Sequence, residues 1–229
     1  VSPAQWLAHD DAACKVDFWL RNLRDVRQSL EGLNIPLLIR SIDTWEQAPQ
    51  AVLEVCRQHQ VASVHWNEEY GINEQRRDDA TRALLEKSGI QAHSHLDQLF
   101  FRPGTVLTRS GDYFQVFSQF KKTCLELLHR SLPAMAHRVK QQAPLQIQSD
   151  PIPQHVEGFE KPERALQAHW PAGEAEAQGR LSRFLDETID DYQQLRDLPA
   201  KPGTSQLSAY LAAGVISPRQ CLHGALASN

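Results

Sequence analysis

The alternation of helix-like and strand-like segments over the first 95 residues constrains the fold more than any other feature. Apolar residues recur every three or four positions, the spacing of amphipathic helices, in three stretches. These are residues 12–30, 44–59 and 73–88. Short apolar runs at 35–39, 61–66 and 90–93 follow them and indicate buried strands. Such an alternation predicts right-handed crossovers and a doubly wound, Rossmann-like parallel sheet of the α/β class.

A proline-punctuated stretch separates this α/β region from a second, helical one. Prolines recur through residues 141–171, which predicts an irregular connection. Helical spacing returns over 174–194 and 210–212, and Ser217-Pro218 is typical of a helix start. We therefore expect an α/β domain at 1–125, a linker at 126–172 and the beginning of an all-α domain at 173–229.

Charge and composition exclude several classes of protein. No uncharged apolar stretch is long enough to cross a bilayer, and the first residues do not resemble a signal peptide. The net charge of −4 excludes a polybasic nucleic-acid binder, although residues 102–140 carry a local positive excess. Four widely spaced cysteines form no CxxC pair, which favours reduced thiols. We expect a cytoplasmic monomer that contacts no membrane and holds no metal, since His93 and His95 have no third ligand nearby.

The C-terminal segment carries a motif that is specific enough to identify a family. Residues 203–223 resemble the pattern G-T-S-R-L-S-x-x-L-A-x-G-x-[LI]-S-P-R-Q-C, which opens the FAD-binding domain of DNA photolyases and cryptochromes. Residues 191–199 resemble the family's Y-x-x-x-R-D-x-P segment, and residues 72–78 its N-E-x-x-R-D segment. Residues 111–120 resemble Y-x-V-F-[TS]-P-F, with Gln119 in place of proline. The resemblance covers nearly the whole chain and is closest to bacterial cyclobutane pyrimidine dimer photolyases of the folate-antenna type.

This resemblance implies light-driven repair of DNA containing pyrimidine dimers, by electron transfer from reduced FAD. A second cofactor, 5,10-methenyltetrahydrofolate, would act as the antenna. It also implies that the family's first strand precedes Val1 and that most of the FAD domain follows Asn229, so that no catalytic residue lies within this chain and the chain alone is inactive. Two alternatives stay open: a cryptochrome-type blue-light receptor, and a stand-alone nucleotide-binding α/β module.

The resemblance places FAD contacts on a short run of residues. They are Tyr192, Thr204, Ser205, Gln206, Leu207 and Ser208. Chemistry supports this placement, because a pyrophosphate needs hydroxyls and free backbone N–H groups at a helix start. The alternative for Thr204 and Ser205 is an ordinary helix cap. Gln206 departs from the arginine of the family pattern, so an ionic contact from this position is missing.

Three further residues match the antenna site of the family, and one matches its DNA-binding surface. Asn73 and Glu74 match the positions that hold the pterin ring, and His9 matches a further antenna-side position. A carboxylate suits the pterin edge because it can accept two parallel hydrogen bonds. The alternatives are a helix start for Asn73 and Glu74 and a solvated loop for His9. Arg196 implies a contact with the phosphates of the damaged strand, and its alternative is a surface ion pair with Asp197.

Overall fold

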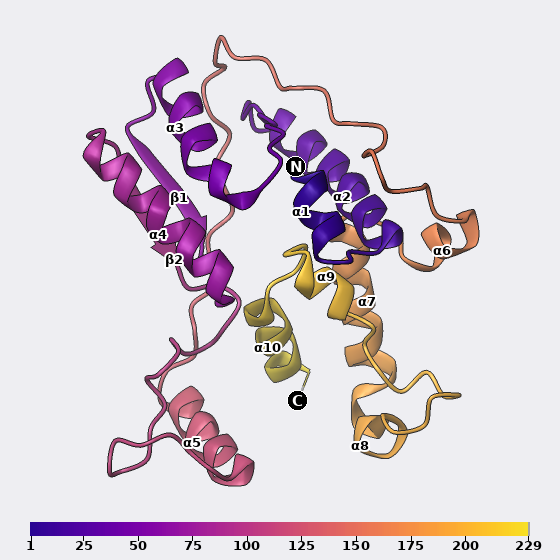
Figure 1. Cartoon of the computed structure of the whole chain (residues 1–229). Helices are drawn as coiled ribbons and strands as arrows, with labels where there is room; N and C mark the ends of the chain where they lie inside the picture. Colours follow the sequence, from indigo (N-terminus) through magenta and orange to yellow (C-terminus); the bar gives the residue numbers. More distant parts are fainter. Residues whose placement is uncertain (229) are drawn as a thin grey trace.

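A parallel sheet and two helices form one packed unit of the protein. The structure, a computed structural model, describes residues 1–228. Strands β1 (Ser63–Asn67) and β2 (Gln91–His95) pair in parallel, with Ser63 opposite Gln91. Helix α4 (Ile72–Lys87) connects the two strands, and α3 (Ala48–Gln58) packs beside it after a 3₁₀ turn over Trp45–Gln47 (Figure 1). The expected α/β class with a parallel sheet is confirmed.

The two helices cover one face of this sheet. Leu53, Cys56, Leu85 and Ile90 are buried there and form a single apolar cluster. Because side chains alternate along a strand, the opposite face carries a different set. Its residues include the exposed His65, His93 and His95, and the Nδ1 atom of His65 lies 3.0 Å from Nε2 of His95. No group of three or more potential ligands within residues 1–228 is arranged to hold a metal ion.

The strand expected at residues 35–39 is wrong. This run forms no strand in the described chain, because its backbone groups are engaged by residues 149–150 instead. The Asp150 N–H donates to the Leu37 carbonyl at 2.9 Å, and the Leu37 N–H donates to Ser149 Oγ at 3.1 Å. The Ile39 N–H donates to a carboxylate oxygen of Asp150 at 2.8 Å. Apolar composition was therefore a correct sign of partial burial but not of a place in the sheet.

Helix α2 (Ala13–Glu31) packs against the C-terminal half of the chain. One side of it joins an apolar cluster with residues 152–159. Helix α1 (Pro3–Ala8) adds Trp6 to this cluster, with its ring centroid 5.2 Å from that of Trp19 and the two rings tilted by 55°. The other side presents Phe18 to a second cluster of buried residues. That cluster contains Phe18, Ala177, Leu207, Tyr210 and Ile216. Helix α2 thus links the N-terminal region to the helices that carry the candidate flavin residues.

A buried asparagine fixes this link. Asn22 is only 7% exposed, and its Nδ2 donates to the Phe18 carbonyl at 2.8 Å. Its Oδ1 accepts from the N–H of Gly173 at 2.9 Å. Gly173 has a φ of +110° and immediately precedes α7, so the amide holds the start of that helix. Asn22 lies in the expected α/β domain (1–125) and Gly173 in the expected helical domain (173–229), so the contact joins the two. The boundaries of the linker at 126 and 172 stay a prediction.

The C-terminal region is helical, as expected, but its first helix is interrupted. The helix expected over residues 174–194 consists of α7 (Glu174–Glu187), a 3₁₀ turn over Ile189–Asp191 and α8 (Tyr192–Leu195). The break falls at Thr188, whose φ of −132° is not helical. Helices α9 (Ser208–Ala212) and α10 (Pro218–Ala227) follow. Ser217 caps α10 through a reciprocal capping box with Gln220, which confirms the expected helix start.

The connection between the two halves is largely irregular and runs over the outside of the molecule. Helix α5 (Phe117–Arg130) stands apart from the other helices, and the following segment passes the sheet before it reaches α6 (Arg164–His169) (Figure 1). Helix α6 was not expected; it is held against α2 by a hydrogen bond of 2.9 Å from Gln167 to Asp17. Within the described residues, no helix has both the length and the apolar character needed to cross a membrane.

Candidate functional site

The 203–208 loop presents a row of hydrogen-bond donors that the protein itself does not use. Within residues 1–228, no hydrogen bond engages the N–H groups of Thr204, Ser205 and Gln206. The hydroxyls of Thr204, Ser205 and Ser208 are equally without a partner in this part of the chain, and none of them caps α9. Thr204 and Ser208 are exposed and Ser205 is half-buried. The loop therefore offers an anion both backbone and side-chain donors.

Close packing brings this loop against α8. Gly203 is buried, and a Cβ atom at this position would lie 2.7 Å from the carbonyl carbon of Leu195. Only glycine allows that approach. Tyr192, at the start of α8, is 39% exposed and stacks edge-on against Phe184 with ring centroids 5.8 Å apart. The packing thus places the loop next to the Tyr192 helix; Gly203 lies eleven positions after Tyr192 in the sequence.

Arg196 lies at the surface beside this loop region. Its Nε is 3.6 Å from a carboxylate oxygen of Asp197, and the side chains are 51% and 81% exposed. Its guanidinium also lies 5.9 Å from the ring centroid of Tyr192. An ion pair this exposed and this long contributes little to stability. The arginine can therefore exchange Asp197 for another anion at little cost.

The sequence did not reveal that Gln206 has an arginine partner. The Nη1 of Arg180, on α7, donates to Oε1 of Gln206 at 3.1 Å. Arg180 is also hydrogen-bonded to Glu176 at 2.9 Å and to the His169 carbonyl at 2.7 Å. Twenty-six residues separate Arg180 from Gln206, so no local pattern could have connected them.

One of the three antenna candidates, Asn73, lines a pocket beside helix α4. A pocket of about 310 Å³ is lined by Gln5, Trp45 and the helix α4 residues Asn73, Arg76 and Arg77, among others. The Asn73 side chain makes no hydrogen bond within the described residues. Asn73 thus lines a pocket, and its role in holding a pterin stays a prediction. No sequence pattern indicated that Trp45 and Gln5 would line the same pocket.

His9 and Glu74 lie next to this pocket but do not line it. The Nε2 of His9 is 2.7 Å from Nε2 of Gln5, and its ring lies 5.3 Å from that of Trp45. The Glu74 carboxylate folds back over Gly71 at the start of α4, where the helix dipole favours a negative charge. Glu74 makes no ion pair within residues 1–228, so its oxygens remain available to a ligand.

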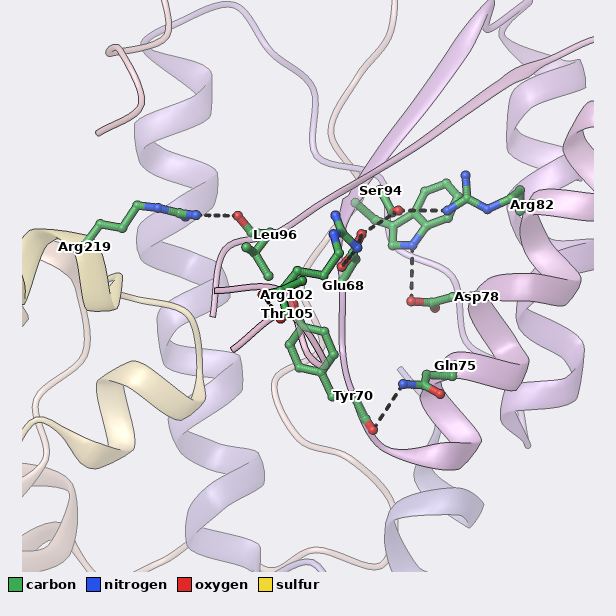
Figure 2. Close-up of polar contacts among 11 residues, drawn as sticks. Glu68, Tyr70, Gln75, Asp78, Arg82, Ser94, Leu96, Arg102, Thr105 and Arg219 are labelled. Atoms are coloured by element: carbon green, nitrogen blue, oxygen red, sulfur yellow. Dashed lines mark hydrogen bonds and ion pairs between the residues drawn. The ribbon is translucent and has the colours of Figure 1, made fainter. Parts of the chain in front are cut away.

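A polar cluster occupies the carboxyl end of the sheet, where α/β proteins commonly bind ligands. Figure 2 shows Glu68, directly after β1, between Arg102 and Ser94. Arg102 Nη1 donates to both Glu68 oxygens, at 3.0 and 2.9 Å, and Ser94 Oγ donates at 3.0 Å. Burial raises the pKa of Glu68, but the hydrogen bonds from Arg102 and Ser94 and the charge of Arg102 outweigh it and lower the pKa overall.

Tyr70 adds a buried hydroxyl to this cluster. Its OH has no hydrogen-bond partner among the described residues, and burial together with the nearby Glu68 carboxylate raises its pKa. On the other side, Arg219 of α10 donates to the Leu96 carbonyl at 2.7 Å (Figure 2). Arg219 also donates to the Asp97 carboxylate at 3.0 Å. The cluster therefore connects the sheet to the C-terminal helices.

Comparison with known proteins gives the family. The family model for DNA photolyase matches residues 1–140. The chain belongs to the DNA photolyase family. A deoxyribodipyrimidine photo-lyase from Salmonella typhimurium is 33% identical over 231 residues, which cover 100% of this chain and 47% of that protein. The chain thus spans about half the length of the curated relatives it matches.

Solved structures agree with this assignment. A class III photolyase from Agrobacterium tumefaciens superposes with a TM-score of 0.68 at 26% identity, over 98% of this chain and 45% of that one. A cryptochrome from Synechocystis superposes with a TM-score of 0.63 at 15% identity, over 95% of this chain and 45% of that one. At 15% identity the cryptochrome shows only that the fold is shared. The expected resemblance to bacterial cyclobutane dimer photolyases is confirmed.

Proposed function

We propose that the protein is a deoxyribodipyrimidine photolyase, which uses light to repair cyclobutane pyrimidine dimers in DNA. The observation that carries this proposal is the match to curated photolyases along the whole chain, the 203–208 loop included. The shared fold with a cryptochrome does not favour light signalling, because it rests on 15% identity. A stand-alone nucleotide-binding module leaves the features of residues 191–223 without an explanation.

The loop fits the phosphates of FAD. The N–H groups of Thr204 to Gln206 and the hydroxyls of Thr204, Ser205 and Ser208 would donate to them, with Leu207 anchoring the loop in the core. Tyr192, held edge-on against Phe184, would contact the flavin from α8. When bound, FAD would supply the one-electron chemistry that splits the dimer. The residues of this chain would bind and orient the cofactor, and Arg196 would contact a DNA phosphate.

The pocket beside α4 fits a folate, and we propose 5,10-methenyltetrahydrofolate as the antenna. The Trp45 ring offers a flat apolar surface for a planar pterin, and the amide of Asn73 and the carboxylate of Glu74 are free to bond to its polar edge. Arg76 is exposed at the rim, where it would attract the carboxylates of a glutamate tail. His9 would act indirectly, by holding Gln5 and Trp45 in place.

Removal of the loop hydroxyls tests the flavin site. We expect the double variant Thr204→Val/Ser205→Ala, made in the protein expressed from its complete reading frame, to bind FAD about thirtyfold more weakly. Two neutral hydrogen bonds at about 1 kcal/mol each account for this loss. Flavin retained through gel filtration is the measurement, and folate content is expected to stay unchanged.

A hydroxyl elsewhere provides the control. Ser182→Ala removes an exposed hydroxyl from α7, away from the loop, and is expected to leave flavin content as it is. Full flavin retention by the double variant would show that the Thr204 and Ser205 hydroxyls do not contribute to flavin binding. A wild-type protein that binds a mononucleotide and no flavin would overturn the proposed function itself.

A further inference from the structure

Arg180 contacts residues from several segments that lie around the 203–208 loop. Its side chain is only 12% exposed, and its three nitrogens are hydrogen-bonded to Glu176, Gln206 and the His169 carbonyl. Its guanidinium carbon lies 5.3 Å from the ring centroids of both Trp170 and Tyr210. A planar cation held by stacking and by three directed hydrogen bonds has a single position available to it.

Gln206 needs such a partner because its backbone is in an unfavourable conformation. Its φ of +51° is left-handed, a conformation that is unfavourable for a residue with a Cβ atom. The side chain of Gln206 is exposed, so packing does not hold it there. The hydrogen bond from Arg180 to Oε1 is the contact that holds it. With Gln206 fixed, the loop keeps the conformation in which the N–H groups of residues 204–206 have no partner in the described chain.

The family pattern indicates a second role for the Arg180–Gln206 pair. The pattern has arginine where this chain has Gln206, and this chain has an arginine, Arg180, within hydrogen-bond distance of that position. A guanidinium and an amide are thus paired at this place, with the cation on α7 and not in the loop. The pair can be made with the charge on either partner, because an amide side chain both donates and accepts.

We infer that Arg180 is a positioning residue for the 203–208 loop, and that it supplies from α7 the cation that the family pattern carries at position 206. Arg180 acts through Gln206 and does not itself touch the phosphates. This inference rests on the proposed function, since it assigns to Arg180 the shaping of a flavin-binding loop.

Exchange of the two side chains is the decisive experiment, in the protein expressed from its complete reading frame. Arg180→Gln is expected to weaken FAD binding on the order of tenfold, which is the loss of one hydrogen bond from a charged donor. Gln206→Arg alone is also expected to weaken it, because two guanidinium groups then face each other. The exchanged protein, Arg180→Gln/Gln206→Arg, is expected to recover most of the loss.

Two further variants separate positioning from simple stability. Gln206→Ala removes the acceptor while the stacked Arg180 stays in place; it is expected to weaken FAD binding severalfold with little change in melting temperature. Arg183→Gln is the matched control, since Arg183 lies on the same helix, contacts the same Glu176 at 3.5 Å and makes no contact with the loop. Unchanged flavin binding by Gln206→Ala, or an exchanged protein no better than Arg180→Gln, would overturn the inference.

A readout without flavin distinguishes this inference from the proposed function. Hydrogen exchange of a peptide over residues 207–215 reports on the N–H groups of Leu211 and Val215, which are bonded to the carbonyls of Leu207 and Tyr210 at 2.9 and 2.8 Å. Arg180→Gln is expected to speed hydrogen exchange in this peptide, whether or not flavin is bound. The double variant Arg180→Gln/Gln206→Arg is expected to slow it again. If the wild-type protein binds no flavin but the double variant still shows slower hydrogen exchange than Arg180→Gln, the proposed function fails and the positioning role stands. Exchange rates unchanged by Arg180→Gln would refute the positioning role.

Discussion

Removal of the Asn22 amide is predicted to weaken the link between α2 and α7. In Asn22→Ala the N–H of Gly173 loses its acceptor at a buried site, since Asn22 is 7% exposed and Gly173 is buried. A buried, unsatisfied donor costs about 1–3 kcal/mol. The Phe18 carbonyl is affected less, because it also belongs to the hydrogen-bond ladder of α2. We therefore expect a loss of about 2 kcal/mol in the free energy of unfolding.

Urea unfolding followed by tryptophan fluorescence is a suitable assay, because Trp170 lies three residues before Gly173 and packs against the cluster that contains Phe18. Gln28→Ala is the control: Gln28 lies on the same helix, is exposed and makes no side-chain hydrogen bond within the described residues. A change of less than about 0.5 kcal/mol in Asn22→Ala, the size expected for a surface substitution, would show that the Asn22 amide does not stabilise the link between α2 and α7.

Two further predictions concern the antenna pocket and the cluster at the end of the sheet. Glu74→Ala is expected to lower folate occupancy, seen as near-ultraviolet absorbance, while FAD content and flavin-driven repair persist; unchanged absorbance would show that Glu74 does not bind the pterin. The folded-state pKa of Glu68 is lowered from 4.5, so its ion pair stabilises the protein above about pH 4.5 and this contribution is lost as the pH falls through the lowered value. The difference in stability between wild type and Glu68→Gln should therefore shrink below pH 4.5. A difference that is equal at pH 7 and in acid would contradict the role of Glu68.

Local sequence signals were sufficient for most of the fold. Helical spacing predicted α2, α3 and α4, and the capping residues predicted the start of α10 at Ser217. The failure at residues 35–39 has a physical cause: apolar composition reports burial, but a strand also needs a partner backbone, and here residues 149–150 provide the hydrogen bonds. Helix α6 was missed because its stability comes from contacts with α2, distant in sequence.

The candidate site was predictable where it is continuous in sequence and not where it is assembled by folding. The 203–208 loop is one short motif, and the structure shows its donors without partners in the described chain. Arg180 and Trp45 carry no signal of their own, because an arginine on an amphipathic helix usually faces solvent and a tryptophan before a helix is usually a packing residue. Only the fold brings Arg180 to Gln206 and Trp45 to Asn73.

We propose that this chain is part of a light-driven DNA repair enzyme, and an assay of repair is the most direct test of that function. The measurement is the conversion of a thymine dimer in a short DNA duplex back to thymines by the purified protein, expressed from its complete reading frame and loaded with reduced flavin. We expect repair under near-ultraviolet or blue light and none in the dark. Dimers that stay intact under illumination, with flavin bound and the DNA in complex, would refute the proposed function.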